Sequence, residues 1–147
     1  MARPHDIEVT VRSYELDALR HTNNAVYLNW MEQARLYVFE RLGFGVTALI
    51  EGRTLYNIVR AEIDFRSPTF FGDRVVIGTE LESLGTSSLK LRHPMTRADD
   101  GSVVCSTREV VVWLGPDGRP MPVPDDVRAA LETLARAGAE DEQGEAS

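Results

Sequence analysis

The sequence predicts an α+β domain in which a largely antiparallel sheet of five strands wraps around one long helix. The helix is indicated by an apolar stripe at steps of three and four residues, formed by Tyr27, Met31, Ala34, Val38 and Leu42. Five other segments have strand character, and tight turns rather than helices join most of them. Because strands and helices do not alternate along the chain, we expect antiparallel rather than parallel pairing.

The first elements are a strand and the long helix. Residues 7–14, IEVTVRSY, alternate apolar and polar residues and predict a strand. The helix is expected over residues 24–42, where Asn23 or Asn24 is a good N-cap and Gly43 is a good residue just past the C-terminus. Further apolar residues widen the stripe beyond one face, so we expect this helix to be covered on more than one side.

Four more strands and a short helix follow. The first of these strands alternates cleanly and places Val59, Ala61, Ile63 and Phe65 on one face. The turn sequences SPTFFGD, GTS and RADDGS separate the strands, and RADDGS is a strong hairpin signal. The expected elements are strands at 56–66, 74–84, 87–95 and 103–114 and a final helix at 125–137.

Composition and charge exclude several classes of protein. The chain has 147 residues, of which 43% are hydrophobic, as in a globular domain with a real core. No apolar run approaches the ~20 residues of a transmembrane helix, and the N-terminus lacks the apolar stretch of a signal peptide. The net charge is −7 and no basic stripe is present, so we expect neither a membrane nor a nucleic-acid partner.

The chain is expected to form one domain over residues 1–137, followed by an acidic disordered tail over 138–147. A single cysteine, Cys105, excludes an internal disulfide and is expected to be a small core residue. Together with the absence of a targeting segment in the sequence, this favours the cytoplasm.

A polar cluster immediately precedes the apolar helix. Asp17, His21, Asn23 and Asn24 fall within eight residues of one another in the run LDALRHTNNAVYLNWMEQAR. Residues of these types commonly cap a helix and do nothing else. Only their context in the rest of the chain favours a chemical role.

That context resembles hotdog-fold acyl-CoA thioesterases of the 4-hydroxybenzoyl-CoA thioesterase type. The family pattern has an acid after the first strand, then Gly-His-Val-Asn-Asn, an aromatic residue and Glu-x-Ala-Arg in the helix. The corresponding residues here are Asp17, Arg20-His21-Thr22-Asn23-Asn24, Tyr27 and Glu32-Gln33-Ala34-Arg35. The resemblance continues through IDFRSPTFFGD and GRPMPVPDDVR and covers nearly everything except the tail.

Two positions depart from the pattern. Arg20 replaces the family's glycine and Thr22 replaces its valine. If the glycine requires a positive φ, Arg20 must adopt a strained or altered turn, unless its side chain enters the site.

The resemblance implies a hotdog fold, a substrate that is a thioester of coenzyme A, and a homodimer with the two sheets joined edge to edge and the sites at the interface. A thioester of acyl carrier protein is a less favoured substrate, and a homotetramer is an open alternative. Pairing of the edges would also hide an exposed strand, which is otherwise a liability. No cofactor is implied.

The chemistry assigns roles to the cluster. Asp17 is expected to be the nucleophile or the general base of thioester hydrolysis, and the sequence does not separate these two routes. His21 could hydrogen-bond the substrate carbonyl or orient Asp17, and a structural role in the turn is an equal alternative. The first amides of the helix, from Asn24 through Ala25 to Tyr27, have no intrahelical acceptor and are expected to form an oxyanion hole.

Other candidate residues have simpler explanations. Glu32 is a weaker rival to Asp17 as the catalytic acid, but we expect it to form a structural ion pair with Arg35. His93 is expected to be a core or interface residue, and the scattered histidines with one cysteine predict no metal site. The cationic residues Arg60, Arg66, Lys90 and Arg92 could meet nucleotide phosphates, although we favour a solvated strand face for each.

Two other function classes remain open at this stage. A hotdog enoyl-CoA hydratase would resemble an Asp-x-Asn-Pro-x-His pattern, whereas Ala-Leu-Arg separates Asp17 from His21 here. A non-catalytic acyl-binding hotdog domain is the second alternative, and an intact Asp17 argues against it. Thioester hydrolysis measured beside enoyl-CoA hydration distinguishes the three.

Overall fold

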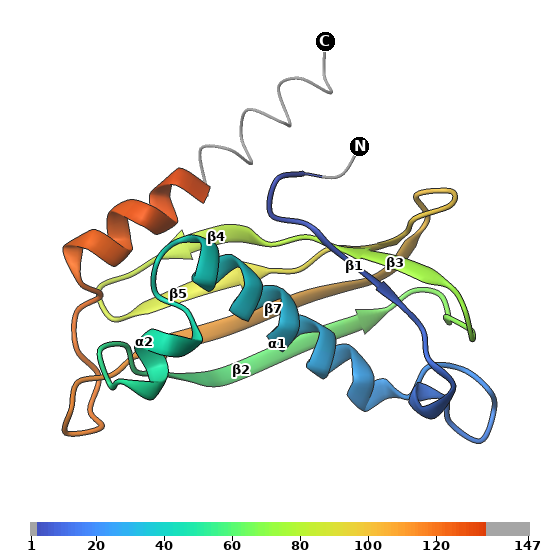
Figure 1. The fold of residues 1–147 in the computed structure, drawn as a ribbon, viewed down its shortest axis with the longest axis horizontal. Coiled ribbons are helices and arrows are strands. Elements are labelled where there is room, and N and C mark those ends of the chain that lie inside the picture. Colours follow the sequence, from blue (N-terminus) through green and yellow to red (C-terminus); the bar gives the residue numbers. More distant parts are fainter. Residues whose placement is uncertain (1–2, 135–147) are drawn as a thin grey trace, which may run out of the picture.

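The computed structural model describes residues 3–134, which form a sheet with a long helix packed against it (Figure 1). In chain order, its strands and helices before residue 115 are β1 (Ile7–Thr10), the 3₁₀ turn η1 (Ser13–Glu15), α1 (Asn24–Arg41), α2 (Val46–Ile50), β2 (Tyr56–Phe65), β3 (Arg74–Ile77), β4 (Glu80–Leu84), β5 (Ser88–Arg92), β6 (Met95–Arg97) and β7 (Val103–Trp113). A last helix covers residues 125–134. The end of the predicted helix, 135–137, and the predicted tail, 138–147, lie outside the described residues.

The sheet is antiparallel throughout, as expected. Its order is β1-β3-β6-β7-β5-β4, with β2 paired to the other side of β7. Two of the five expected strands are each divided in two, so that seven strands result. The segment 74–84 breaks between β3 and β4 at Gly78–Thr79, and the segment 87–95 breaks at His93–Pro94, where proline has no N–H for the ladder.

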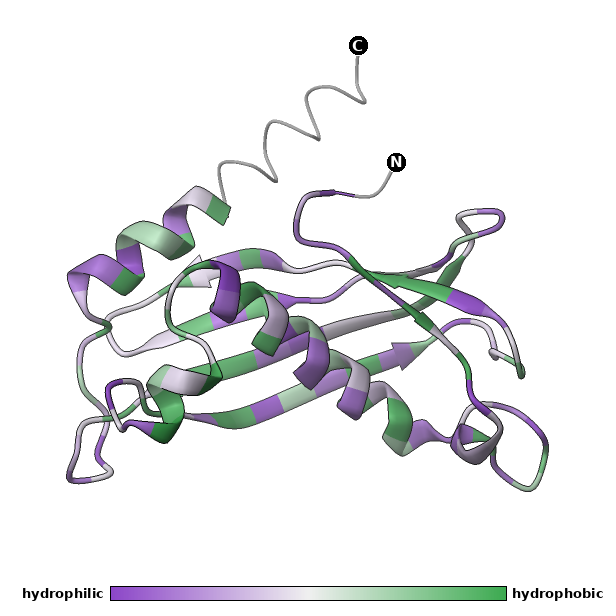
Figure 2. Cartoon of the chain, viewed as in Figure 1, coloured by the Kyte–Doolittle hydropathy of each residue, from purple (hydrophilic) through white to green (hydrophobic). Residues whose placement is uncertain are grey.

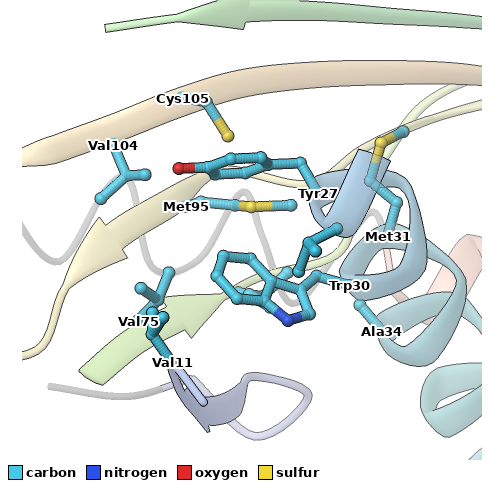
Figure 3. Packing of buried hydrophobic residues seen from close by; sticks show 11 residues of the cluster. Val11, Tyr27, Trp30, Met31, Ala34, Val75, Met95, Val104 and Cys105 are labelled. Atoms are coloured by element: carbon cyan, nitrogen blue, oxygen red, sulfur yellow. The ribbon is translucent and has the colours of Figure 1, made fainter. Parts of the chain in front are cut away.

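The long helix begins and ends close to the predicted residues. Asn23 is the N-cap, because its side-chain oxygen accepts from the backbone N–H of Ala25, and the helix ends at Arg41 with Leu42 as C-cap. Gly43 follows at φ 96°, a left-handed conformation that suits glycine. Buried side chains lie on more than one face of α1, among them Tyr27 and Trp30, which project toward the sheet (Figure 3).

The core consists of two apolar clusters at the two ends of α1. The cluster around Tyr27, Trp30 and Met31 packs against β3, β6 and β7, and the cluster around Phe39 packs against β5, β7 and the last helix. Hydrophobic residues alternate with hydrophilic ones along α1 and β2 (Figure 2).

A buried polar network lies in the same core. Arg35 Nη1 donates to Glu109 Oε2 at 2.7 Å, and Glu109 Oε1 lies 3.1 Å from His93 Nε2. The expected ion pair between Glu32 and Arg35 is therefore wrong: Glu32 is exposed, and the guanidinium of Arg35 turns inward to the buried carboxylate of β7. His93 is fully buried, which confirms its prediction as a core residue.

β2 is an edge strand, paired only with β7. Ile58, Val59 and Phe65 on this strand are 36%, 60% and 50% exposed, although the alternation of the sequence predicted one apolar face. The short helix α2 was not predicted, because five residues are too few to display a helical period. Within residues 3–134, no helix is both long and apolar enough to cross a membrane.

Candidate active site

Asp17 lies between η1 and α1, where the chain forms a short loop ahead of the helix (Figure 1). The N–H of Asp17 donates to the carbonyl of His21 at 2.8 Å, and the N–H of Arg20 donates to the carbonyl of Asp17 at 3.0 Å. At the base of the loop, the N–H of Asn23 donates to the carbonyl of Glu15 at 2.8 Å. Residues 17–22 thus form a compact turn held at the N-terminus of the helix.

Only one of the two carboxylate oxygens of Asp17 accepts hydrogen bonds within the described residues. Oδ1 accepts the N–H groups of Leu19 and His21 at 2.9 and 3.2 Å, an arrangement that orients the side chain within the turn. Oδ2 has no hydrogen-bond partner within residues 3–134. The carboxylate is therefore fixed by its own loop and has one oxygen available for chemistry.

Arg20 adopts the altered turn that its place in the motif predicts. Its φ is 64°, the only positive φ of a non-glycine residue among those described. This conformation costs about 1–2 kcal/mol for a residue with a Cβ. The Arg20 side chain is exposed and is not among the residues that line the cavity described below.

The amides at the start of α1 differ in their hydrogen bonds. The N–H of Ala25 donates to the side-chain oxygen of Asn23 at 3.0 Å, and the N–H of Val26 donates to the Asn23 carbonyl at 2.9 Å. The N–H of Asn24, the first helical residue, has no acceptor within the described chain. Of the amides expected to form an oxyanion hole, that of Ala25 is thus used by the Asn23 cap, whereas that of Asn24 has no acceptor within residues 3–134.

A second wall comes from the end of β2 and the segment after it. The N–H groups of Arg66 and Ser67 both donate to the carbonyl of Val104, and Ser67 Oγ donates to the carbonyl of Val103. These bonds hold the segment against β7 as the chain turns away from the sheet. Together the two walls enclose a cavity of about 310 Å³ lined by Asp17, His21, Thr22, Asn24, Tyr27, Phe65, Arg66, Ser67 and Pro68.

Aromatic contacts orient two of these residues. The His21 ring packs edge-on against Phe70 with centroids 5.2 Å apart, and the Tyr27 ring packs edge-on against Phe65 at the same separation. The Tyr27 hydroxyl lies 3.0 Å from Thr69 Oγ1. Burial raises the pKa of Tyr27, which outweighs the opposing effect of this hydrogen bond, so the phenol is neutral near pH 7.

The structure separates the other candidates from this cavity. Glu32 is exposed farther along α1 and does not line it, and Cys105 is buried in the core. Arg66 is the one candidate phosphate ligand that lines the cavity, whereas Arg60 and Lys90 lie together at a different surface hollow with Arg108. Within residues 3–134, no three His, Cys, Asp or Glu side chains come together as a metal site would require.

Another cavity, of about 520 Å³, lies between β1, β3 and β6, away from Asp17. Its arginines are paired with nearby acids: Arg74 with Glu8 and Asp99, and Arg97 with Asp73. The smaller cavity is the candidate site, because a carboxylate with a free oxygen and a free helix amide both line it.

Sequence reasoning missed several residues of the site. Phe65, Ser67 and Pro68 belong to IDFRSPTFFGD, which signalled the resemblance but was not assigned a role. Thr22 was noted only as a departure from the pattern, and its buried contact with Thr69 had no signal in the sequence.

Comparison with known proteins agrees with this geometry. Residues 11–131 match the thioesterase-like superfamily. The chain is 32% identical over 101 residues to the long-chain acyl-CoA thioesterase FadM of Escherichia coli, covering 66% of this chain and 73% of FadM. It is 26% identical over 136 residues to the chloroplastic acyl-acyl carrier protein thioesterase ATL3 of Arabidopsis thaliana, covering 92% of this chain and 72% of ATL3.

A solved structure shows the same fold at higher identity. A thioesterase of Thermus thermophilus, complexed with coenzyme A and zinc, is 37% identical and superimposes with a TM-score of 0.77, covering 89% of this chain and 94% of that one. The matched sequence, the antiparallel sheet around α1 and the motif from Asp17 to Arg35 therefore agree, and the chain belongs to the thioesterase-like superfamily with its hotdog fold.

Proposed function

We propose that this protein is an acyl-CoA thioesterase that uses Asp17 and the amide of Asn24 at one cavity. The observation that carries the proposal is the free Oδ2 of a carboxylate anchored in a cavity that the first residue of α1 also lines. The named activities of the matched relatives support thioester hydrolysis over enoyl-CoA hydration and over simple acyl binding.

The reaction follows from these two groups. Either Asp17 attacks the thioester carbonyl carbon, the C–S bond breaks and water then hydrolyses the mixed anhydride, or Asp17 takes a proton from the water that attacks. In both routes the thiolate of coenzyme A leaves and takes up a proton, and the carbonyl oxygen becomes negative in the tetrahedral stage. The Asn24 N–H, at the positive end of the helix dipole, would stabilise that oxygen by about 2.7–4 kcal/mol.

The remaining side chains bind and shape the substrate. His21, held edge-on by Phe70, can donate to the thioester carbonyl from the same side as the Asp17 loop. Phe65 and Pro68 provide an apolar wall for the acyl group, and Arg66 can meet an anionic part of the substrate. No metal or cofactor has a part in these steps.

The test is hydrolysis of a series of acyl-CoA thioesters, read as release of free thiol, by the wild type and two matched carboxylate variants. Asp17→Asn keeps an oxygen that can accept the amides of Leu19 and His21 but removes the charge and the nucleophile. We expect kcat to fall by roughly two orders of magnitude or more. Glu32→Gln, on an exposed helix face, should leave kcat within about twofold.

Each outcome bears on the proposal. Full activity of Asp17→Asn together with a folded but inactive Glu32→Gln would mean that Glu32 is the catalytic carboxylate. Hydrolysis of acyl carrier protein thioesters but not of acyl-CoA would assign the other carrier, and activity toward enoyl-CoA alone would assign a hydratase.

We further propose that two copies pair through their β2 edges, so that the sites lie near the interface. The support is an edge strand with unpaired backbone groups and the exposed apolar side chains Ile58, Val59 and Phe65. Val59→Lys places a charge on this edge and should convert a dimer to monomers in light scattering. A monomeric wild type at micromolar concentration contradicts the proposal, and a mass of four chains indicates the tetramer.

The single domain over residues 1–137 and a cytoplasmic location are also part of the proposal. The match over residues 11–131 supports the first, and the lone, buried Cys105 supports the second.

A further inference from the structure

Three buried hydroxyl groups form a chain beside the candidate active site. Tyr27 Oη lies 3.0 Å from Thr69 Oγ1, Thr69 Oγ1 donates to Thr22 Oγ1 at 2.6 Å, and Thr22 Oγ1 donates to the Thr69 carbonyl at 3.3 Å. Tyr27, Thr69 and Thr22 are 3%, 0% and 4% exposed. They come from α1, from the segment after β2 and from the Asp17 loop, which are far apart in the sequence.

The hydroxyl protons of these three side chains can be placed in only one way. Thr22 uses its proton on the Thr69 carbonyl and therefore accepts from Thr69. Thr69 has a single hydroxyl proton, which it gives to Thr22, so the contact between Thr69 and Tyr27 must use the proton of Tyr27. Because these three residues are buried, each hydroxyl depends on the next for its hydrogen bonds.

Thr22 is also the point at which the Asp17 loop is attached to the rest of the molecule. The hydrogen bonds of residues 17–21 within the described chain all stay inside the loop. Thr22 alone reaches out of it: both its N–H, at 2.9 Å, and its hydroxyl donate to the carbonyl of Thr69. Among the hydrogen bonds, those of Thr22 therefore hold the loop against the segment after β2, beside the packing of the His21 ring on Phe70.

We infer that Thr22 is a positioning residue for the reaction, which holds the Asp17 carboxylate at its working distance from the Asn24 amide through Thr69 and Tyr27. The inference rests on the proposed function, because the groups positioned are those assigned to hydrolysis. Valine, which the resembling family has at this position, keeps the shape and the backbone N–H of Thr22 but has no hydroxyl. A small displacement of a reacting group lowers turnover steeply, so the loss of the hydroxyl should lower kcat more than it weakens binding.

The experiment compares Thr22→Val, Thr22→Ser and a matched control, Thr79→Val. Thr79 is 6% exposed and its hydroxyl lies 3.1 Å from His93 Nδ1, in the core and away from the cavity. We expect Thr22→Val to lower kcat about tenfold with KM within about twofold, and Thr22→Ser to restore kcat to within about twofold. Thr79→Val should reduce thermal stability and leave kcat unchanged.

A second comparison tests whether the effect passes through the hydroxyl chain. Thr69→Val removes the middle hydroxyl. In the double variant with Thr22→Val, kcat should therefore fall no further than in the single variant with the larger loss of kcat. Losses that multiply would show that the two threonines act independently, and they would overturn the inference.

Hydrogen exchange makes the test independent of activity. The amides of Leu19 and His21, which bind Asp17 Oδ1, should exchange about tenfold faster in Thr22→Val and unchanged in Thr79→Val. If the wild type hydrolyses no thioester, the proposed function fails, and the exchange rates alone decide the role of Thr22. Unchanged exchange, or unchanged kcat in a folded and active Thr22→Val, refutes the inference.

Discussion

Replacement of Glu109 by glutamine tests the buried polar network directly. Glu109 is 2% exposed and uses both carboxylate oxygens, Oε2 on Arg35 at 2.7 Å and Oε1 on His93 at 3.1 Å. Glutamine has nearly the same shape but presents one acceptor and one donor. Glutamine carries no charge, so the buried charge of Arg35 would have no counter-charge at the position of Glu109.

The magnitude follows from this burial. Removing one partner of a buried ion pair costs about 3–5 kcal/mol, and we expect about 3 kcal/mol because the amide oxygen still accepts from Arg35. That loss lowers the melting temperature by roughly 6–12 °C for a domain of this size. The assay is thermal and urea unfolding followed by circular dichroism at pH 7, at one fixed protein concentration because association also contributes to stability.

A matched variant of an exposed glutamate is the control. Glu62 pairs with Arg60 and, at 3.5 Å, with Arg108, and all three side chains are at least 38% exposed. Glu62→Gln should therefore change the free energy of unfolding by less than about 1 kcal/mol. If Glu109→Gln unfolds within about 1 kcal/mol of the wild type, the reasoning from burial is wrong.

The pH dependence provides a second test of the same group. Burial by itself would raise the pKa of Glu109, but the hydrogen bonds and charges of His93 and Arg35 outweigh it and hold the pKa below its ordinary value. Because its pKa is lower in the folded state, Glu109 stabilises the fold at pH values above its unfolded pKa of about 4.3. This stabilisation is lost as pH falls through the folded pKa. Glu109→Gln lacks this contribution, so its stability should vary less than that of the wild type below about pH 4.5.

Three further predictions concern residues near the site or in the core. Burial raises the pKa of Cys105 to about 12, so a thiol reagent at pH 8 should label the native protein far more slowly than the unfolded chain, and equal rates would contradict its burial. Arg20→Gly relieves the left-handed residue and should stabilise the fold by about 0.5–1 kcal/mol in urea unfolding, with a loss of stability as the contrary result. Asn23→Ala removes the cap of α1 and should cost about 0.5–2 kcal/mol by the same measurement, whereas an unchanged midpoint would show that the cap is dispensable.

Local features of the sequence predicted the helix and the cluster before it. The cap at Asn23 and the glycine at Gly43 each act on the helix end beside them, and the apolar stripe repeats with the helical period, so all three are recognisable without the rest of the fold. Asp17, His21 and Asn24 are close in the chain, and for that reason alone they had to lie near the start of the helix. The motif also indicated the hotdog fold.

The tertiary structure decided which residue each polar group meets. Arg35 had a local candidate in Glu32 but pairs with Glu109, 74 residues away, because Arg35 lies on the inward face of α1, where it meets the buried carboxylate of β7. Thr22 meets Thr69, 47 residues away, and the breaks at Gly78–Thr79 and His93–Pro94 divide two strands whose alternation appeared continuous. A sequence pattern specifies which residues are apolar and how the local backbone turns, whereas partners from distant strands are chosen only when the sheet has packed against the helix and water has been excluded.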